Sequence, residues 1–171
     1  MAHAAAEPDP RASSRPIVIV VSERWETLEA IELPVLGQLW LGRRTRLAGR
    51  RVDCFDLPAG SPVRRGFTQS VLRRSERELE RYWIEQALSG GPLPPREVAS
   101  GEEVVRRVAA RRGAIGYLDW DEYLALRPQG VRVLPVRIAG EAVFPTGAAY
   151  PVRWSERKSE IAPKTRSSSL R

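Results

Sequence analysis

The sequence is poor in the residues on which most enzyme and metal chemistry depends. Its 171 residues include a single cysteine, Cys54, and a single histidine, His3. A disulfide within the chain is therefore excluded, and a Cys/His zinc site or a Ser-His-Asp triad would lack essential members. There is also no Walker phosphate loop, dinucleotide fingerprint or HExxH motif. We therefore predict no catalytic residues, metal ligands or cofactor, and these absences favour a binding protein over an enzyme.

Long apolar runs and lysine are scarce as well. The longest apolar run, Ile17–Val21, is far too short to span a membrane. Lys158 and Lys164 are the only lysines, so nearly all of the 28 basic residues are arginine, and the net charge is +7. Arginine suits planar contact with phosphate or carboxylate, although a GC-rich genome produces the same excess.

The distribution of charge does not favour nucleic acid as the partner. Residues 17–154 hold 21 basic and 17 acidic side chains, a mild balance of +4. Nucleic-acid domains usually concentrate more charge on one face and add aromatic residues for stacking. One cluster without acids stands out, and it is either a solvated loop or part of an anion-attracting surface: Arg43, Arg44, Arg46, Arg50 and Arg51.

The order of predicted elements is typical of an α/β fold. Strands are predicted at Ile17–Val21, Arg51–Leu57, Ala114–Leu118 and Val131–Ile138, and Pro135 indicates an edge strand or a break in the last. Helical spacing of apolar residues over 28–41 predicts a helix with Pro34 in its first turn and Gly42 at its end. Cys54 fits a small core residue.

Three further helices begin at serine caps, and one of them differs from the other two. Ser75 and Ser100 are each followed three residues later by glutamate, which is the pattern of a capping box. Ser61 is instead followed by Pro62 and then by Arg64. We expect the amides of Val63 and Arg64 to point outward without an acidic partner and to attract an anion. The alternative is that Ser61 alone caps the helix and Arg64 is solvated.

The two ends of the chain differ in composition from the middle. Residues 1–15 lack apolar periodicity and are predicted to be disordered, with Ala-x-Ala triplets like the end of a secretory signal. Residues 155–171 are predicted to form a basic disordered tail, which leaves 16–154 as one domain. Within it, Asp119, Asp121 and Glu122 are interpreted as a turn with solvated carboxylates rather than a metal site.

Several strings of the sequence together resemble the phosphate-binding proteins of ABC transporters, and most closely their short, single-domain relatives. The family's IFLGK segment, its DGSGT loop followed by phenylalanine, and its GAIGY strand have counterparts here. They are LWLGR at 39–43, AGSPVRRGF at 59–67 and GAIGY at 113–117. Further matches are Gly49, Tyr82, Trp83, Gly90 and Val104. The resemblance covers about residue 17 to Val136.

The resemblance implies the class II periplasmic binding protein fold, here as a single domain with a mixed sheet flanked by helices. In the full-length family, hydroxyls, helix-end amides and an arginine with its carboxylate partner hold dehydrated phosphate. Gly60 and Ser61 match the ligand loop directly. Pro62 and Val63 stand where the family has Gly-Thr, and Leu57 stands where it has an arginine ahead of the loop. We infer that Arg64 supplies the positive charge instead.

The site is expected to be open. The chain begins after the family's first phosphate loops, so about half of the usual cleft is expected to be missing. Ser22, directly after the first strand, is expected to face the same end of the sheet as Ser61, where α/β folds place ligands.

The leading functional hypothesis is a non-enzymatic, substrate-binding-protein-like domain. It binds phosphate or a similar small oxyanion through Gly60, Ser61, Val63, Arg64 and Ser22, and the resemblance implies a link to ABC-type phosphate transport. The first alternative is an interaction module that kept the fold and lost the ligand, with a membrane transporter or envelope protein as partner. The second is a basic nucleic-acid-binding protein. The resemblance implies a periplasmic location, whereas a true start at Met1 would imply a cytoplasmic one.

Overall fold

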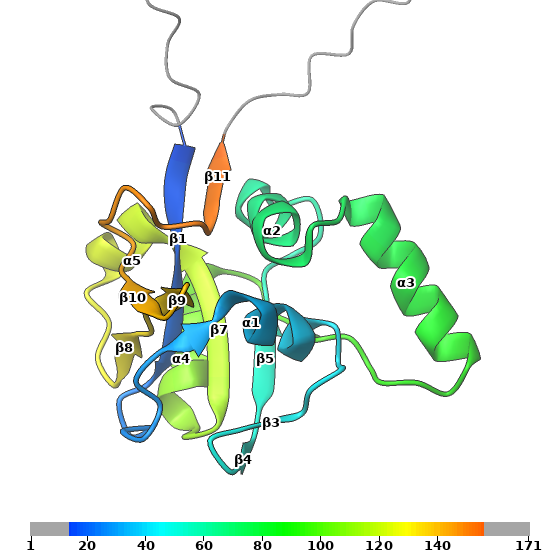
Figure 1. Cartoon of the computed structure of the whole chain (residues 1–171), viewed down its shortest axis with the longest axis horizontal. Helices are drawn as coiled ribbons and strands as arrows, with labels where there is room; N and C mark the ends of the chain where they lie inside the picture. Colours follow the sequence, from blue (N-terminus) through cyan, green and yellow to red (C-terminus); the bar gives the residue numbers. More distant parts are fainter. Residues whose placement is uncertain (1–13, 156–171) are drawn as a thin grey trace, which may run out of the picture.

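A mixed β-sheet with helices on both faces forms the centre of the protein (Figure 1). The computed structural model describes residues 14–155. The main sheet contains β1 (Ser14–Ser22), β5 (Asp53–Asp56), β6 (Arg96–Glu97), β7 (Ala114–Asp119), β8 (Val131–Val133) and β11 (Arg153–Ser155). Its order is β11-β1-β7-β5-β6, and β8 also pairs with β1. The predicted α/β fold, with a mixed sheet flanked by helices, is confirmed.

Strand direction decides which loops share an end of this sheet. β1 is antiparallel to β7, with Ile17 opposite Asp119 and Val21 opposite Ile115. β5 is parallel to both β7 and β6. The predicted run Ile17–Val21 is fully buried within β1, as continuous β-branched residues in a covered strand should be. The carboxyl ends of β5 and β7 therefore lie together, and the carboxyl end of β1 lies at the opposite end.

Helices cover both faces of β7, and its alternating side chains receive them. The helices are α1 (Leu33–Trp40), α2 (Pro62–Phe67), the π-helical turn η1 (Thr68–Leu72), α3 (Glu76–Leu88), α4 (Gly101–Ala110) and α5 (Trp120–Leu126). A Cβ on Gly116 would lie 2.4 Å from Val104 Cγ1, so this glycine lets α4 approach the sheet. On the next residue, the Tyr117 ring stacks on Phe67 with centroids 3.9 Å apart.

Short strands complete the fold beside the main sheet. β2 (Ile31–Glu32), β9 (Val136–Ile138) and β10 (Glu141–Val143) form a three-stranded sheet, and β3 (Arg46–Leu47) pairs with β4 (Arg50–Arg51) as a hairpin. The predicted strand over 131–138 is split, because Leu134 and Pro135 separate β8 from β9, which belong to different sheets. The break expected at Pro135 is confirmed.

The helix caps show which local predictions hold. The Ser75–Glu78 capping box is complete, and Pro34 lies in the first turn of α1. Ser100 accepts from the Glu103 amide, but the Glu103 carboxylate accepts from the amide of Ala99 rather than from that of Ser100. The second box is therefore only half formed.

Two element predictions are wrong. The helix expected over 28–41 begins only at Leu33, because Ile31 pairs in β2 with β9. The turn expected at 119–122 is the start of α5, where Asp119 is the N-cap. Asp119 is buried rather than solvated, and it accepts the indole N–H of Trp154 at 2.6 Å.

The ordered strands extend slightly past the predicted domain limits. β1 begins at Ser14 and β11 ends at Ser155, and these two residues pair with each other. The rest of the predicted terminal segments, residues 1–13 and 156–171, lies outside the described residues. None of the helices within 14–155 combines the length and the apolar character needed to cross a bilayer.

Candidate anion site at the start of α2

The loop from β5 to α2 brings four of the five predicted ligand residues together. Gly60 has a φ of 81°, which favours glycine, and the chain then turns into α2. The Ser61 hydroxyl accepts from the Arg64 amide at 3.4 Å, and Pro62 occupies the first turn. Pro62 has no N–H and the Arg64 amide is taken by the cap, so the Val63 amide is left to a partner outside the helix.

Arg64 lies at the centre of the site and is not a solvated side chain. Its side chain is 17% exposed, and its Nη1 donates to the Leu57 carbonyl at 2.8 Å. The same Nη1 lies 2.6 Å from Glu97 Oε2, while Nε lies 3.5 Å from Asp56 Oδ2. The guanidinium therefore joins the end of β5 to the residue that ends β6.

Asp56 is the buried carboxylate partner of Arg64, and sequence reasoning did not single it out. It is 4% exposed at the end of β5, and the Tyr117 hydroxyl donates to its Oδ1. Burial raises the pKa of Asp56 and outweighs the opposing effects of the Arg64 guanidinium and the Tyr117 hydrogen bond. The alternation within Arg51–Leu57 gave Asp56 no distinction from Asp53. The contact that distinguishes it joins two strands 61 residues apart.

Carboxylates from other elements reach this helix start, on the Gly60 amide and on arginine side chains rather than on the predicted amides of Val63 and Arg64. The Gly60 amide donates to Glu76 Oε1 at 3.1 Å, and Arg65 Nε lies 3.4 Å from Glu76 Oε2. With Glu97 on Arg64, two carboxylates from elsewhere in the chain occupy donors of the predicted site. Local spacing could not reveal them, because Glu97 follows Arg64 by 33 residues and Glu76 belongs to the next helix.

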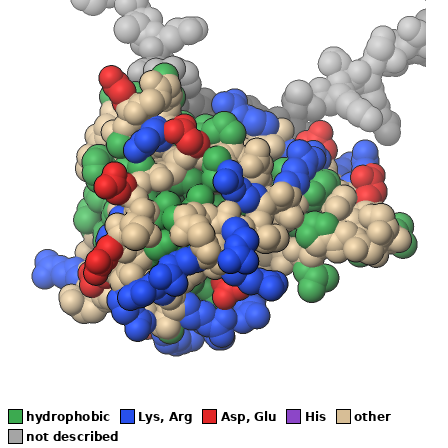
Figure 2. All heavy atoms as spheres, turned by 60° about the horizontal axis from the view of Figure 1, so that its bottom comes forward, with side chains coloured by type: hydrophobic (Ala, Val, Ile, Leu, Met, Phe, Trp, Pro, Cys, Tyr) green, Lys and Arg blue, Asp and Glu red, His purple; other side chains and the backbone are tan. Residues whose placement is uncertain are grey.

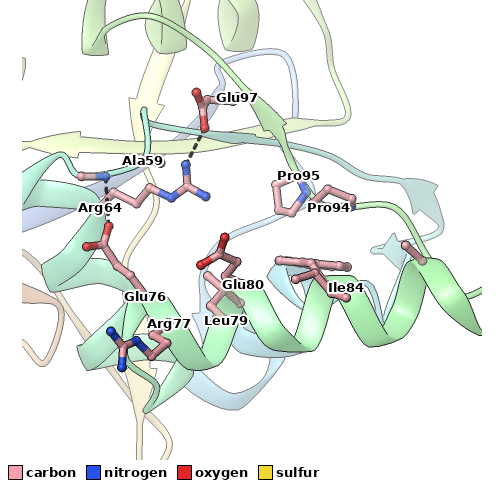
Figure 3. Close-up of a pocket in the computed structure, with 13 residues that line it drawn as sticks. Ala59, Arg64, Glu76, Arg77, Leu79, Glu80, Ile84, Pro94, Pro95 and Glu97 are labelled. Carbon is pink, nitrogen blue, oxygen red and sulfur yellow. Dashed lines mark hydrogen bonds and ion pairs between the residues drawn. The ribbon is translucent and has the colours of Figure 1, made fainter.

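A cavity of about 720 Å³ opens beside these groups (Figure 3). The close-up shows Arg64, Glu97 and Glu80 on one side and the proline pair Pro94–Pro95 facing α3. Leu79, Trp83, Ile84 and Ala87 supply an apolar wall from α3. The cavity therefore combines two arginines, Arg64 and Arg77, and three glutamates with a largely apolar remainder.

Ser22 does not join the site. It is the last residue of β1, beyond the pairing of Val21 with Ile115 at the beginning of β7. Ser61 follows the carboxyl end of β5, which is parallel to β7. The expectation that Ser22 faces the same end of the sheet is therefore wrong, because β1 runs antiparallel to its neighbours. Its hydroxyl accepts instead from the Arg24 amide at 3.3 Å.

Other candidate chemistry in the described part of the chain is limited. Burial raises the pKa of the Cys54 thiol well above its usual value, with Asp56 and Asp53 adding to the effect. Such a thiol remains protonated and is a poor nucleophile. Within residues 14–155, no three His, Cys, Asp or Glu side chains lie together in a way that could hold a metal ion.

The fold is similar to solved phosphate-binding proteins. Neither a protein-family model nor a curated protein matches the chain. Similar solved structures include PstS from Borrelia burgdorferi, at 12% identity and a TM-score of 0.63. They also include a putative phosphate ABC transporter substrate-binding protein with bound phosphate from Clostridium perfringens, at 14% and 0.62. An ABC-type phosphate transport receptor from Vibrio cholerae is a third, at 14% and 0.60.

These similarities establish the fold and its extent. Each comparison covers 84% of this chain but only 54–56% of the other protein. The chain therefore spans about half the length of the proteins it resembles in structure. Identities of this size show a shared fold, and the ligand has to be argued from the residues of this chain.

Proposed function

We propose that the protein is a non-enzymatic binding domain for phosphate or a similar small oxyanion, and that Arg64 is its anchoring cation. The observation that carries the proposal is the Arg64–Asp56 pair at the edge of an open cavity. A guanidinium held by a buried carboxylate behind it keeps a fixed orientation and can still form bidentate hydrogen bonds to an oxyanion in front. The structural neighbours named as phosphate-binding proteins support the same ligand class.

The chain's own carboxylates indicate where the oxyanion would bind. Glu97 contacts Arg64 Nη1 and its side chain is 54% exposed, so it can turn toward solvent when another anion takes its place. Glu76 likewise accepts a hydrogen bond from the Gly60 amide, a donor that the oxyanion would otherwise use. An oxyanion at this position would have Arg64, the Gly60 amide, the Ser61 hydroxyl and the Val63 amide as donors.

We expect binding to be weak and dependent on ionic strength. The oxyanion must displace Glu97, Pro62 contributes no N–H, and the site is open to solvent on the cavity side. Exposed charge pairs are screened by salt, and the strongest oxyanion sites are desolvated and have many donors. Competition by sulfate is expected, since the donors recognise charge and oxygen geometry.

The test is a calorimetric titration of the full chain with phosphate in low salt, with sulfate as competitor. The wild type should give saturable heat, and Ser61→Asp should remove it while leaving the thermal unfolding midpoint nearly unchanged. Aspartate is as good an N-cap as serine, so α2 should persist while the added carboxylate repels the oxyanion. Retained affinity in Ser61→Asp would refute the site assignment.

A second candidate function is an interaction module that has kept the fold without the ligand. It is favoured by the two carboxylates on the donors and by the form of α3, which extends away from the sheet (Figure 1). Only Leu79 and Tyr82 of its 13 residues are buried. The partner would be a membrane transporter or envelope protein in the periplasm, as expected from the resemblance. Absence of heat up to millimolar phosphate would favour this candidate.

A further inference from the structure

Arginines from four segments of the chain gather toward the end of the sheet where β5 and β7 begin, and Arg96 among them directly precedes Glu97. Figure 2 shows this side of the molecule, where basic side chains gather on the lower part of the surface. We call this surface the arginine face. It comprises Arg43, Arg44, Arg46, Arg50, Arg51, Arg96, Arg111 and Arg112, all of them exposed. Arg44, Arg51 and Arg96 line one hollow, and Arg111 pairs with Asp53 of the same hollow at 3.1 Å, beside Arg112. Arg46 lies opposite Arg51, Arg50 directly precedes Arg51, and Arg43 directly precedes Arg44.

The folded chain separates its charge much more strongly than the sequence indicates. The arginine face holds eight basic residues and one acid, Asp53. The remainder of residues 17–154 holds 13 basic and 16 acidic side chains, so it is slightly negative. The mild balance of +4 is therefore the sum of a strongly positive face and an acidic remainder. Such an asymmetric field attracts an extended anionic surface.

The hairpin at the centre of this face brings like charges together, although Arg46 also donates to the Gly49 carbonyl of its own turn. β3 and β4 place Arg46 directly opposite Arg51, and Arg50 opposite Leu47. Like charges directly opposite each other in an antiparallel pair are destabilising. The turn between them, Ala48–Gly49, has positive φ angles of 46° and 75° and holds the two strands tightly together. Repulsion of this kind is compatible with folding, and an anionic partner would relieve it.

One exposed leucine adjoins the arginines, and a second lies five residues before it in the chain. Leu88 is 84% exposed at the end of α3, and Leu93 is 85% exposed in the loop that follows. Leu93 lines a hollow of about 500 Å³ together with Arg44, Arg51 and Arg96. Within residues 14–155, most of the surface of both leucine side chains is left open to solvent. Apolar side chains beside a basic surface are the combination found where proteins lie on a bilayer interface.

We propose that the arginine face docks on an anionic phospholipid surface, with Leu88 and Leu93 entering the headgroup region. Arginines of the face contact lipid phosphates, and the two leucines are removed from water. A nucleic-acid duplex would use the arginines but not the leucines. Binding of single-stranded nucleic acid would need exposed aromatic rings for base stacking. Among residues 14–155 the exposed large aromatic side chain is Phe144, and it is not part of the arginine face.

The test is cosedimentation of the full chain with vesicles, either of phosphatidylcholine alone or of phosphatidylcholine mixed with phosphatidylglycerol. The wild type should bind only the mixed vesicles, and less strongly as salt rises. The triple variant Arg46→Gln, Arg50→Gln, Arg51→Gln should bind about 100-fold more weakly. Leu88→Ser combined with Leu93→Ser should reduce binding about tenfold.

A matched control separates a local effect from loss of net charge. Arg73→Gln, Arg77→Gln and Arg127→Gln remove the same charge at exposed positions outside the face, and should leave vesicle binding within about twofold of wild type. Circular dichroism and thermal unfolding check that each variant is folded. Three results would overturn the proposal: no binding to mixed vesicles, equal loss in the control, or tighter binding to duplex DNA that the leucine substitutions leave unchanged.

Discussion

Asp56 is a carboxylate that the fold buries beside both an arginine and a tyrosine. It is 4% exposed, accepts the Tyr117 hydroxyl and lies 3.5 Å from Arg64. These two partners favour the ionised form, but burial is the larger effect and raises the pKa of Asp56 above its usual value of 3.8. The ionised form of Asp56 is therefore less favoured in the folded state than in the unfolded state, although its carboxylate lies where it can orient Arg64.

A comparison of wild type with Asp56→Asn tests this balance. Since the folded pKa is raised, the native state binds a proton more readily than the unfolded state between 3.8 and the raised value. The contribution of Asp56 to stability should therefore grow as pH falls from neutral through that window. Urea unfolding at several pH values should show that the free energy of unfolding of wild type rises relative to that of Asp56→Asn as the pH is lowered. If the stability difference stays constant with pH, or if the variant becomes relatively more stable on acidification, the Arg64 charge outweighs burial in setting the pKa of Asp56.

At the scale of elements, the sequence predicted features that depend on neighbouring residues but not those that depend on distant ones. Ser75–Glu78, Ser61–Pro62 and Pro34 marked helix starts correctly because caps depend on residues within one turn. β2 and β11 have two and three residues, and pairing with distant strands alone defines them. The same reason applies to the site. The loop at Gly60–Arg64 was predicted from its sequence, whereas Asp56, Glu76, Glu97 and Tyr117 reach it through the fold.

Gly66 shows how closely α2 packs against β11. A Cβ at this position would lie 2.2 Å from Trp154 Cβ and 2.7 Å from its Cα, so the main chain itself would have to move. Gly66→Ala should lower the free energy of unfolding by about 2 kcal/mol or more, although alanine is the better helix former.

The control is Gly37→Ala in α1, where the nearest atom, the Val71 carbonyl oxygen, lies at 3.3 Å. This variant should remain within about 1 kcal/mol of wild type in the same chemical denaturation experiment. Equal stability of the two variants would contradict the close packing of α2 on β11.

At the scale of the whole molecule, the two ends of the sheet carry different chemistry. The carboxyl end of β5 places Arg64 beside a cavity with its own carboxylates, and most of the arginine face lies toward the end where β5 begins, with Pro94 and Pro95 lining both hollows. The composition gave the total charge but not this separation, because segments as distant as Arg43 and Arg112 meet only in the fold. The chain spans about half the length of the phosphate-binding proteins that its fold resembles.

The central claim is that an external oxyanion shares Arg64 with Glu97, and the most direct measurement is phosphate affinity in Glu97→Gln. Removal of the competing carboxylate should raise the affinity about fivefold over wild type, as expected for release of a partly exposed ion pair. Glu141→Gln, an exposed acid on β10, makes the same change in charge away from the site and should have no such effect. Unchanged or weaker binding in Glu97→Gln would contradict the account.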